Sequence, residues 1–274
     1  MSRNRSMQFR QLTEEDWLLF LHWAAQENWR VSFQEKRLFQ NQWRPYFFAL
    51  HAEGEVQGFV SAVAYKESGW IGNLLVAEER RGHGYGSALF DFSLEFLRQA
   101  NLRRIWLTAS EKGQPIYERR GFKVVDLIER WRAIGLGNSV APVTSDVVEL
   151  VDIDTNCWGE SRAPLIRALH DDGIIYRVEN AIGLLQQSVS AWQLGPWLSL
   201  DNNVRDNRQL LKLVVDKTSL GKDLLIDVLH SAEMDMVLRT SGFEKTGSNQ
   251  LMVLSDEPVR LNGVMALASL GSIG

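Results

Sequence analysis

The residues of this 274-residue chain that most clearly point to chemistry form a glycine-rich loop. The stretch Trp70 to Leu97, WIGNLLVAEERRGHGYGSALFDFSLEFL, contains an apolar run, a charged turn and three alternating glycines, Gly82, Gly84 and Gly86. Glycines at alternate positions allow consecutive backbone N–H groups to converge with no Cβ in the way. Arg81 adds a full positive charge beside them. The loop therefore predicts a site for an anionic group such as a phosphate, the alternative being an ordinary glycine-rich turn.

The residues on either side of the loop predict a strand before it and a helix after it. Ile71 to Val76 has the composition of a buried strand, and Tyr85, Leu89 and Phe92 recur at helical spacing. The N-terminus of such a helix would direct its free N–H groups and partial positive charge at the same anion. The spacing does not match a dinucleotide fingerprint, whose third glycine comes one residue later, or a P-loop, which needs a lysine followed by Ser or Thr.

The rest of the first half predicts alternating strands and helices. Thr13 is a typical N-cap, because acidic residues follow it and Trp17 and Phe20 come at helical spacing. The other expected strands are 7–12, 46–51, 56–65, 104–108, 122–125 and 130–134, and the other expected helices are 33–39 and 114–120.

Two motifs in this order resemble the GNAT N-acetyltransferase superfamily. Arg81 to Gly86 matches the pattern Q/R-x-x-G-x-G/A, and Tyr117 to Phe122, YERRGF, matches Y-x-x-x-G-F. Three longer stretches, WAAQENWR from Trp23, LTASEKGQPIYERRGF from Leu107 and WQLGPWLSLDNN from Trp192, resemble a bacterial subgroup of tandem GNAT proteins.

This resemblance implies an α/β (α+β) fold with two GNAT-like domains. Each would be a mixed, mostly antiparallel sheet flanked by helices, and the fourth and fifth strands of the N-terminal domain would splay apart. We expect a catalytic domain at 1–135, a linker at 136–145, a divergent domain at 146–256 and a frayed or loosely docked tail at 257–274. The second half has an acid in Ser199 to Asn203, where the first half has its basic glycine loop, so we expect it to bind no coenzyme. Its expected role is to complete the sheet, to cover the acceptor site, or both.

The resemblance also implies the roles of individual residues. The cofactor is acetyl-CoA, and a backbone N–H near Leu75 or Val76 would stabilise the developing oxyanion. Tyr117 takes the place of the general acid, although it is equally a packing tyrosine when considered outside the motif. For the acceptor pocket we expect Glu27, Trp29, Trp70 and Asn73. The coenzyme-binding residues implied are Leu74, Leu75, Val76, Arg81, Gly82, His83, Gly84, Tyr85, Gly86 and Ser87.

The sequence does not identify a general base. The fourth strand, where many relatives have a carboxylate, reads Ile71 to Leu74 without one. The groups left open are Glu27, Glu78, Glu79, His51 and His83, together with a chain of waters.

The composition limits the classes of partner that we expect this protein to bind. A formal net charge of −4 argues against nucleic acid, and the single cysteine, Cys157, favours a reducing cytoplasm. The N-terminus has no apolar core of a secretory signal, the apolar C-terminal residues are too few to span a bilayer, and the histidines lack metal-ligand spacing. We expect no membrane and no metal, and a monomer or homodimer.

The predicted function is an N-acetyltransferase that moves an acetyl group from acetyl-CoA to a primary amine, by direct attack in a ternary complex. The acceptor is a small molecule or a peptide: a polyamine, an amino acid, an antibiotic or a protein N-terminus. The alternatives are a non-catalytic acyl-CoA-binding or regulatory protein and an acyltransferase that uses a different acyl-CoA.

Overall fold

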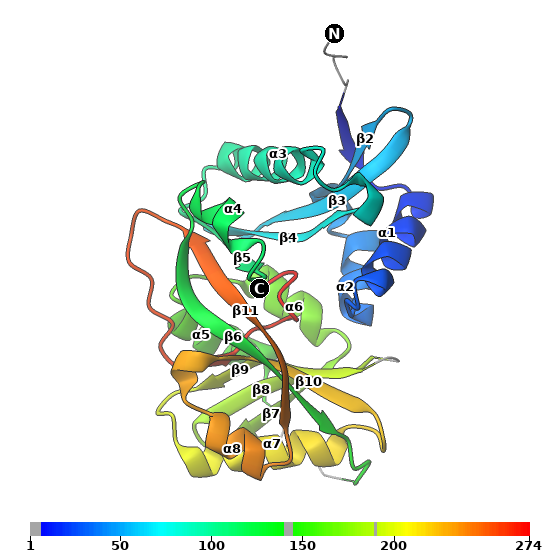
Figure 1. Cartoon of the computed structure of the whole chain (residues 1–274). Helices are drawn as coiled ribbons and strands as arrows, with labels where there is room; N and C mark the ends of the chain where they lie inside the picture. Colours follow the sequence, from blue (N-terminus) through cyan, green and yellow to red (C-terminus); the bar gives the residue numbers. More distant parts are fainter. Residues whose placement is uncertain (1–6, 140–144, 189–190) are drawn as a thin grey trace.

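The computed structural model in Figure 1 describes residues 7–139, 145–188 and 191–274, so the predicted linker lies partly outside the described residues. The first half contains β1 (Gln8–Gln11), α1 (Glu14–Gln26), α2 (Phe33–Gln40), β2 (Phe47–Ala52), β3 (Glu55–Ala64), β4 (Ser68–Val76), α3 (Tyr85–Gln99), β5 (Arg104–Ala109), α4 (Gln114–Glu118) and β6 (Lys123–Ile134). The second contains α5 (Val147–Trp158), α6 (Ala163–His170), β7 (Gly173–Val178), β8 (Ala181–Gln186), β9 (Trp192–Ser199), α7 (Val204–Lys217), β10 (Asp223–Leu229), α8 (Asp235–Thr240), β11 (Glu244–Leu254) and β12 (Val264–Ala266).

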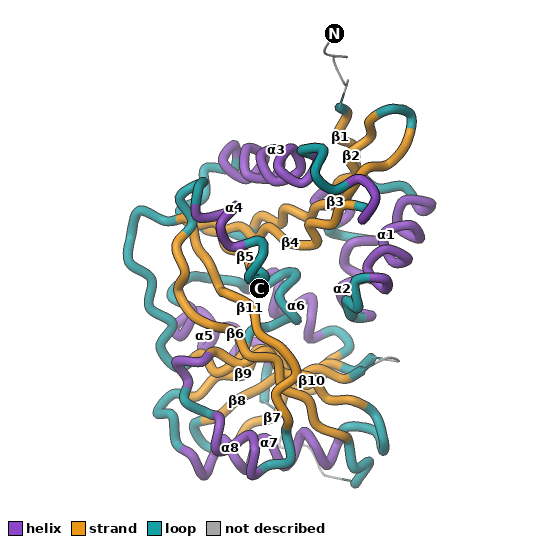
Figure 2. The backbone as a smooth tube through the Cα atoms, in the orientation of Figure 1, coloured by secondary structure: helices purple, strands orange, loops and turns teal. Residues whose placement is uncertain are grey.

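The strands of the described residues join into one mixed sheet, which Figure 2 shows in orange. Its order is β1-β2-β3-β4-β5-β11-β6-β10-β12-β9-β8-β7. The pairs β4–β5 and β9–β10 are parallel, and the other pairs described are antiparallel. The mixed, mostly antiparallel α/β character is therefore confirmed. In place of two separate sheets the chain builds a continuous one, and the division into two domains stays a prediction.

Two long strands make the sheet continuous. β11 comes from the second half of the chain but lies between β5 and β6, where Leu251 is paired with both Thr108 and Asp126. β6 extends beyond this region and pairs along residues 128–134 with β10. The strand break expected between 125 and 130 is wrong, because Lys123–Ile134 uses its whole length to pair with strands from both halves. The second half thus completes the sheet of the first.

β4 and β5 separate part-way along their length. Their parallel pairing covers residues 68–70 of β4 and 104–106 of β5. Beyond Trp70, β4 pairs with β3, and beyond Trp106, β5 continues to pair with β11. A gap therefore opens between the carboxyl ends of the two strands, as expected for the splayed pair.

Capping residues begin the two helices next to this gap. The Thr13 hydroxyl accepts a hydrogen bond from the Asp16 N–H (3.3 Å), and the Asp16 carboxylate accepts one from the Thr13 N–H (2.8 Å), which forms a capping box at α1. The Ser32 hydroxyl accepts a hydrogen bond from the Glu35 N–H (3.0 Å) at the start of α2. Both helices predicted from the sequence are confirmed.

The C-terminal segment (residues 267–274) packs into the gap. The Leu270 carbonyl accepts a hydrogen bond from Arg130 (3.0 Å), and the Gly271 carbonyl accepts one from the Thr108 hydroxyl (2.9 Å). Ile273 is 1% exposed. The expectation of a frayed tail is wrong, because the small and apolar residues of this segment are buried against strands of both halves.

The contact between this segment and β4 yields a stability test. A Cβ at Gly72 would lie 2.0 Å from the Ser272 carbonyl oxygen, so Gly72→Ala must displace the segment. We expect the substitution to lower the free energy of unfolding by about 1–3 kcal/mol, measured by urea denaturation. Gly247→Ala is the matched control, because a Cβ there meets nothing within 4 Å. Equal stability of the two variants would contradict the packing described.

Candidate functional site

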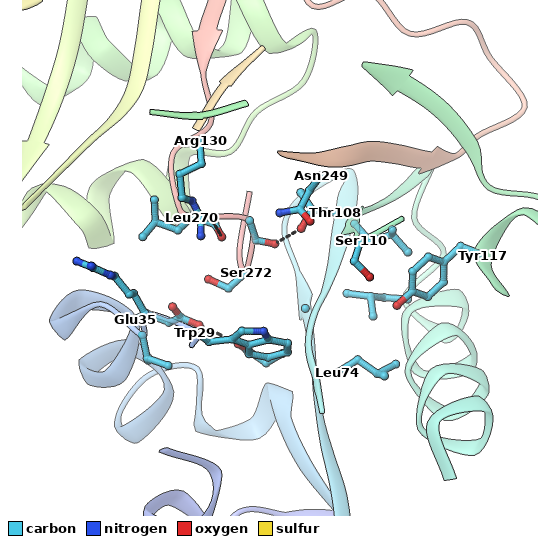
Figure 3. A pocket seen from close by; sticks show the side chains of 17 residues that line it. Trp29, Glu35, Leu74, Thr108, Ser110, Tyr117, Arg130, Asn249, Leu270 and Ser272 are labelled. Atoms are coloured by element: carbon cyan, nitrogen blue, oxygen red, sulfur yellow. Dashed lines mark hydrogen bonds between the residues drawn. The ribbon is translucent and has the colours of Figure 1, made fainter. Parts of the chain in front are cut away.

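A cavity of about 220 Å³ occupies the gap between β4 and β5. Figure 3 shows Tyr117 and Ser110 on one side of it, Trp29 and Glu35 on the opposite side, and Leu74 between them. The cavity is lined by Trp29, Arg30, Val31, Glu35, Ile71, Gly72, Asn73, Leu74, Leu107, Thr108, Ser110, Tyr117, Arg130, Asn249, Leu270, Gly271 and Ser272. Residues from both ends of the chain therefore build this one cavity.

The glycine loop lies at the carboxyl end of β4. Gly82 and Gly84 have φ angles of +80° and +85°, a left-handed conformation that favours glycine, and a Cβ on either would meet nothing within 4 Å. Gly84 is the N-cap of the 15-residue helix α3 and has no side chain to cap it. The loop thus presents open space at a helix N-terminus, which fits the phosphate groups of a nucleotide-like coenzyme.

Arg81 is held beside β4. Its Nε donates a hydrogen bond to the Val76 carbonyl (3.3 Å), and its Nη2 forms an ion pair with Glu27. Glu27 lines a second hollow, together with Leu75, Val76, Glu78 and Glu79 among others, and not the cavity that contains Trp29. The structure therefore places Glu27 beside the glycine loop, where it neutralises Arg81.

The other residues expected in the loop differ in exposure. The His83 ring nitrogen Nδ1 lies 3.1 Å and 3.0 Å from the carbonyl oxygens of Arg80 and Arg81, which holds the ring against the loop backbone. Tyr85 is buried, whereas Ser87 is exposed. The loop backbone at Gly82 and Gly84 therefore faces open space, and the Arg81 guanidinium beside it is paired with Glu27.

A bulge in β4 faces the cavity. Phe59 pairs with Leu75 and Ser61 with Gly72, so β4 carries one residue more than β3 in this interval. Within the bulge Asn73 has a φ of +51°, a left-handed conformation that is unusual for a residue inside a strand. The bulge turns the backbone at Asn73 and Leu74 away from regular pairing, at the point where β5 has already departed.

Tyr117 projects into the cavity from α4. Its ring packs on Phe90, with 4.8 Å between ring centroids, and its hydroxyl faces the cavity in Figure 3. Burial raises the pKa of Tyr117, and the nearby Arg120 works against that shift. The phenol therefore keeps its proton at neutral pH and is able to donate it.

Glu35 is the cavity residue that sequence reasoning missed. It is 5% exposed, and its Oε1 accepts a hydrogen bond from the Asn73 amide at 2.9 Å. Burial raises the pKa of Glu35, while Asn73, the neighbouring Ser272 and the backbone of Ser32 favour the charged form. The available signal was its position three and four residues before Leu38 and Phe39, on the buried face of α2.

The remaining expected residues lie outside the cavity. Trp70 is 1% exposed, and its indole N–H donates a hydrogen bond to the Gly271 carbonyl (3.2 Å). His51 lies 3.9 Å from Asp16 at the far edge of the sheet. No group of three or more His, Cys, Asp or Glu side chains in the described residues has the arrangement of a metal site. Among the described helices, none is long and apolar enough to cross a membrane.

Comparison with known proteins agrees with this geometry. Residues 9–122 match the model of the acetyltransferase (GNAT) family. A holothin acyltransferase from Pseudoalteromonas sp. (strain SANK 73390) is 26% identical over 275 residues, which cover 93% of this chain and 91% of the relative. The protein is an acyltransferase whose residues 9–122 match the GNAT family model.

Solved structures share the fold of the whole acyltransferase. A protein from Pyrococcus horikoshii matches 97% of this chain and 95% of its own, with a TM-score of 0.80 and 16% identity. A GCN5-related N-acetyltransferase from Sphaerobacter thermophilus matches 96% of this chain and 98% of its own, with a TM-score of 0.66 and 13% identity. Both matches extend over the two halves, so the overall fold recurs in proteins of low sequence identity.

The raised pKa of Glu35 predicts how the stability of the acyltransferase varies with pH. Between the ordinary pKa of a glutamate and the raised one, the unfolded chain releases this proton while the folded chain keeps it, so this group lowers stability as pH rises. Glu35→Gln removes the titration. We expect the variant to be more stable than the wild type at pH 8, by about 1.4 kcal/mol for each unit of the shift, and the difference to shrink towards pH 4.

The measurement is urea denaturation at several pH values. Glu95→Gln, an exposed position on α3, is the control and should leave the pH dependence unchanged. A Glu35→Gln variant that is less stable than the wild type at pH 8 would show that the buried carboxyl stabilises the fold.

Proposed function

We propose that this acyltransferase moves an acetyl group from acetyl-CoA to a primary amine, by direct attack within a ternary complex. The observation that carries the proposal is the gap between β4 and β5, where Tyr117 lines the cavity and the glycine loop follows the carboxyl end of β4. A cleft with an anion-binding end and a protonated phenol suits a donor that carries phosphates at one end and a thioester at the other.

The residues proposed to hold the coenzyme lie on one continuous stretch. The backbone of Leu74 to Val76 would contact its extended arm, and the loop from Arg81 to Ser87 would contact its phosphates. When bound, the coenzyme supplies the activated acyl group.

We assign the steps of acyl transfer to backbone and side-chain groups around the gap. The N–H groups near Leu75 or Val76 stabilise the negative charge that develops on the carbonyl oxygen, because the bulged strand holds them in place before the reaction. Tyr117 gives its proton to the departing sulfur. By holding both reactants in one cleft, the site also supplies the advantage of proximity.

The protonated state of Cys157 favours direct attack by the amine over a covalent intermediate on the enzyme. Burial raises the pKa of the Cys157 thiol to about 11, so it is protonated at neutral pH and a poor nucleophile. Cys157 also lies away from the cavity between β4 and β5. We further propose a cytoplasmic enzyme, without a bound nucleic acid or membrane, that acts as a monomer or homodimer on a small-molecule or peptide amine.

A different acyl group remains the second candidate. The name of the Pseudoalteromonas relative specifies an acyltransferase without restricting it to acetyl groups. A comparison of turnover with acetyl-CoA and with longer acyl-CoA thioesters separates the two assignments.

Calorimetric titration with acetyl-CoA tests the coenzyme site. We expect one site per chain and an affinity that Arg81→Ala lowers roughly tenfold or more, because a charge-assisted phosphate contact is lost and Glu27 is left without its partner. Arg80→Ala is the matched control, since Arg80 pairs with the exposed Glu55. Unchanged affinity in Arg81→Ala, or two sites per chain, would refute the assignment.

Replacing Tyr117 tests the proposed acid. Tyr117→Phe keeps the packing on Phe90 but removes the proton, so we expect kcat to fall about 100-fold with little change in acetyl-CoA affinity. Tyr46→Phe, at a tyrosine outside the cavity, serves as the control in a steady-state assay of thiol release. A variant with the wild-type rate would make Tyr117 a packing residue.

A further inference from the structure

The charges around the cavity are unevenly compensated. The two cations that line it already have partners: Arg30 pairs with Asp223 (2.7 Å), and Arg130 donates two hydrogen bonds to Asp227 (2.7 Å each). Glu35 forms no ion pair with any cation of the described residues. The cavity therefore contains one carboxyl group whose charge the described residues leave unbalanced.

A buried carboxyl of this kind is unfavourable unless something else compensates it. Removing a carboxylate from water costs several kcal/mol, and the neutral donors around Glu35, which are Asn73, Ser272 and the backbone of Ser32, recover only part of this. A cation that enters the cavity from outside would supply the missing compensation for the charged form. The place for it is next to Glu35, on the wall opposite Tyr117 (Figure 3).

We propose that Glu35 binds the ammonium group of the acceptor, so that the substrates of this site are amines that enter as cations. The inference rests on the proposed function and identifies the chemical class of its acceptor. Trp29 lines the same side of the cavity and is 40% exposed, so its ring offers an apolar and electron-rich surface next to the ammonium group.

The same carboxylate then takes part in the transfer. It accepts one proton from the ammonium group, which frees the nitrogen lone pair. The nitrogen–carbon bond of the amide forms and the carbon–sulfur bond breaks, while Tyr117 protonates the sulfur. The second proton that leaves the nitrogen restores the Tyr117 phenol, and the proton on Glu35 is released to solvent.

Glu35 is the group expected to titrate in this part of the cavity, because the groups that face it do not change their protonation state. Arg30 and Arg130 are paired with Asp223 and Asp227. The phenol of Tyr65, which directly follows β3, is buried, and burial raises its pKa so that it stays neutral. Asn73 and Ser272 do not titrate. Activity should therefore fall on the acidic side as Glu35 takes up a proton, at a pH above the usual range of a glutamate.

A binding experiment that needs no knowledge of the natural acceptor tests this proposal. We would titrate the protein, saturated with coenzyme A, with n-butylammonium chloride and separately with n-butanol, following the heat in the millimolar range expected of such small ligands. The wild type should bind the ammonium at least roughly tenfold more tightly than the alcohol, and Glu35→Gln should abolish this preference. Glu95→Gln is the control.

Three results would overturn the proposal. They are equal binding of n-butylammonium by the wild type and Glu35→Gln, a wild type that does not prefer the ammonium to the alcohol, and a wild type that binds neither. Glu35→Asp is the second variant, because it keeps the charge, and it should regain part of the preference.

Steady-state kinetics with acetyl-CoA and a panel of primary amines separates this inference from the proposed function. Glu35→Gln should raise KM for the amine, lower kcat/KM at least about 100-fold and lose the acidic limb of the pH profile, with the acetyl-CoA affinity unchanged. Ammonium binding that depends on Glu35 in a protein that fails to bind acetyl-CoA would refute the proposed function alone. Turnover of amines that is unaffected by Glu35→Gln would refute this inference alone.

Discussion

The site depends on one constraint, which is that β4 and β5 cease to pair after Trp70. Unpaired backbone groups inside a protein are unfavourable, so such a separation needs other partners for the groups along its edges. The C-terminal segment fills part of the separation, and its Gly271 carbonyl accepts hydrogen bonds from two side chains along the edges, the Trp70 indole N–H and the Thr108 hydroxyl. Gly72 permits this arrangement, because the backbone of Ser272 lies where a side chain would otherwise be. The gap is thus partly filled by the chain itself, and the cavity is what remains open.

The second half of the chain repeats this geometry with a different outcome. β9 and β10 are parallel and paired at Trp192 and Leu224, as β4 and β5 are at their own starts. Further along, β12 fits between them, and Ala266 is paired with both Val228 and Trp197. The corresponding gap is therefore closed by a strand, so that in the described residues the first half alone keeps the open form. This closure supports the proposal of a single coenzyme site more directly than the acidic residue in the loop after β9 does.

Local sequence predicts the features that depend on neighbouring residues, and it does not predict those that depend on residues far apart in the chain. The N-cap at Thr13 and the start of α3 at the glycine loop follow from neighbouring residues, and both are found in the structure. The pairing of β11 with β5 and β6 joins residues more than 100 positions apart, and no local pattern in Lys123–Ile134 encodes the partners of β6. Glu35 was missed for the same reason. Its capping residue and helix are local features, but its role depends on β4 and on the C-terminal segment, which lie far from it in sequence.

The binding sites of the two substrates differ in the same way, because one is built from local contacts and the other from distant ones. The groups assigned to the donor lie almost entirely within residues 74–87, so a short motif is enough to reveal them. The acceptor side is built from Glu35, Asn73 and Ser272, which meet only when the C-terminal segment has crossed from the second half to β4. A glutamine at position 35 would keep the hydrogen bond to Asn73 without placing a charge in the interior, so the fold does not require the carboxylate. Recognition of a cation explains its presence, and it makes acceptor binding depend on the folding of both halves.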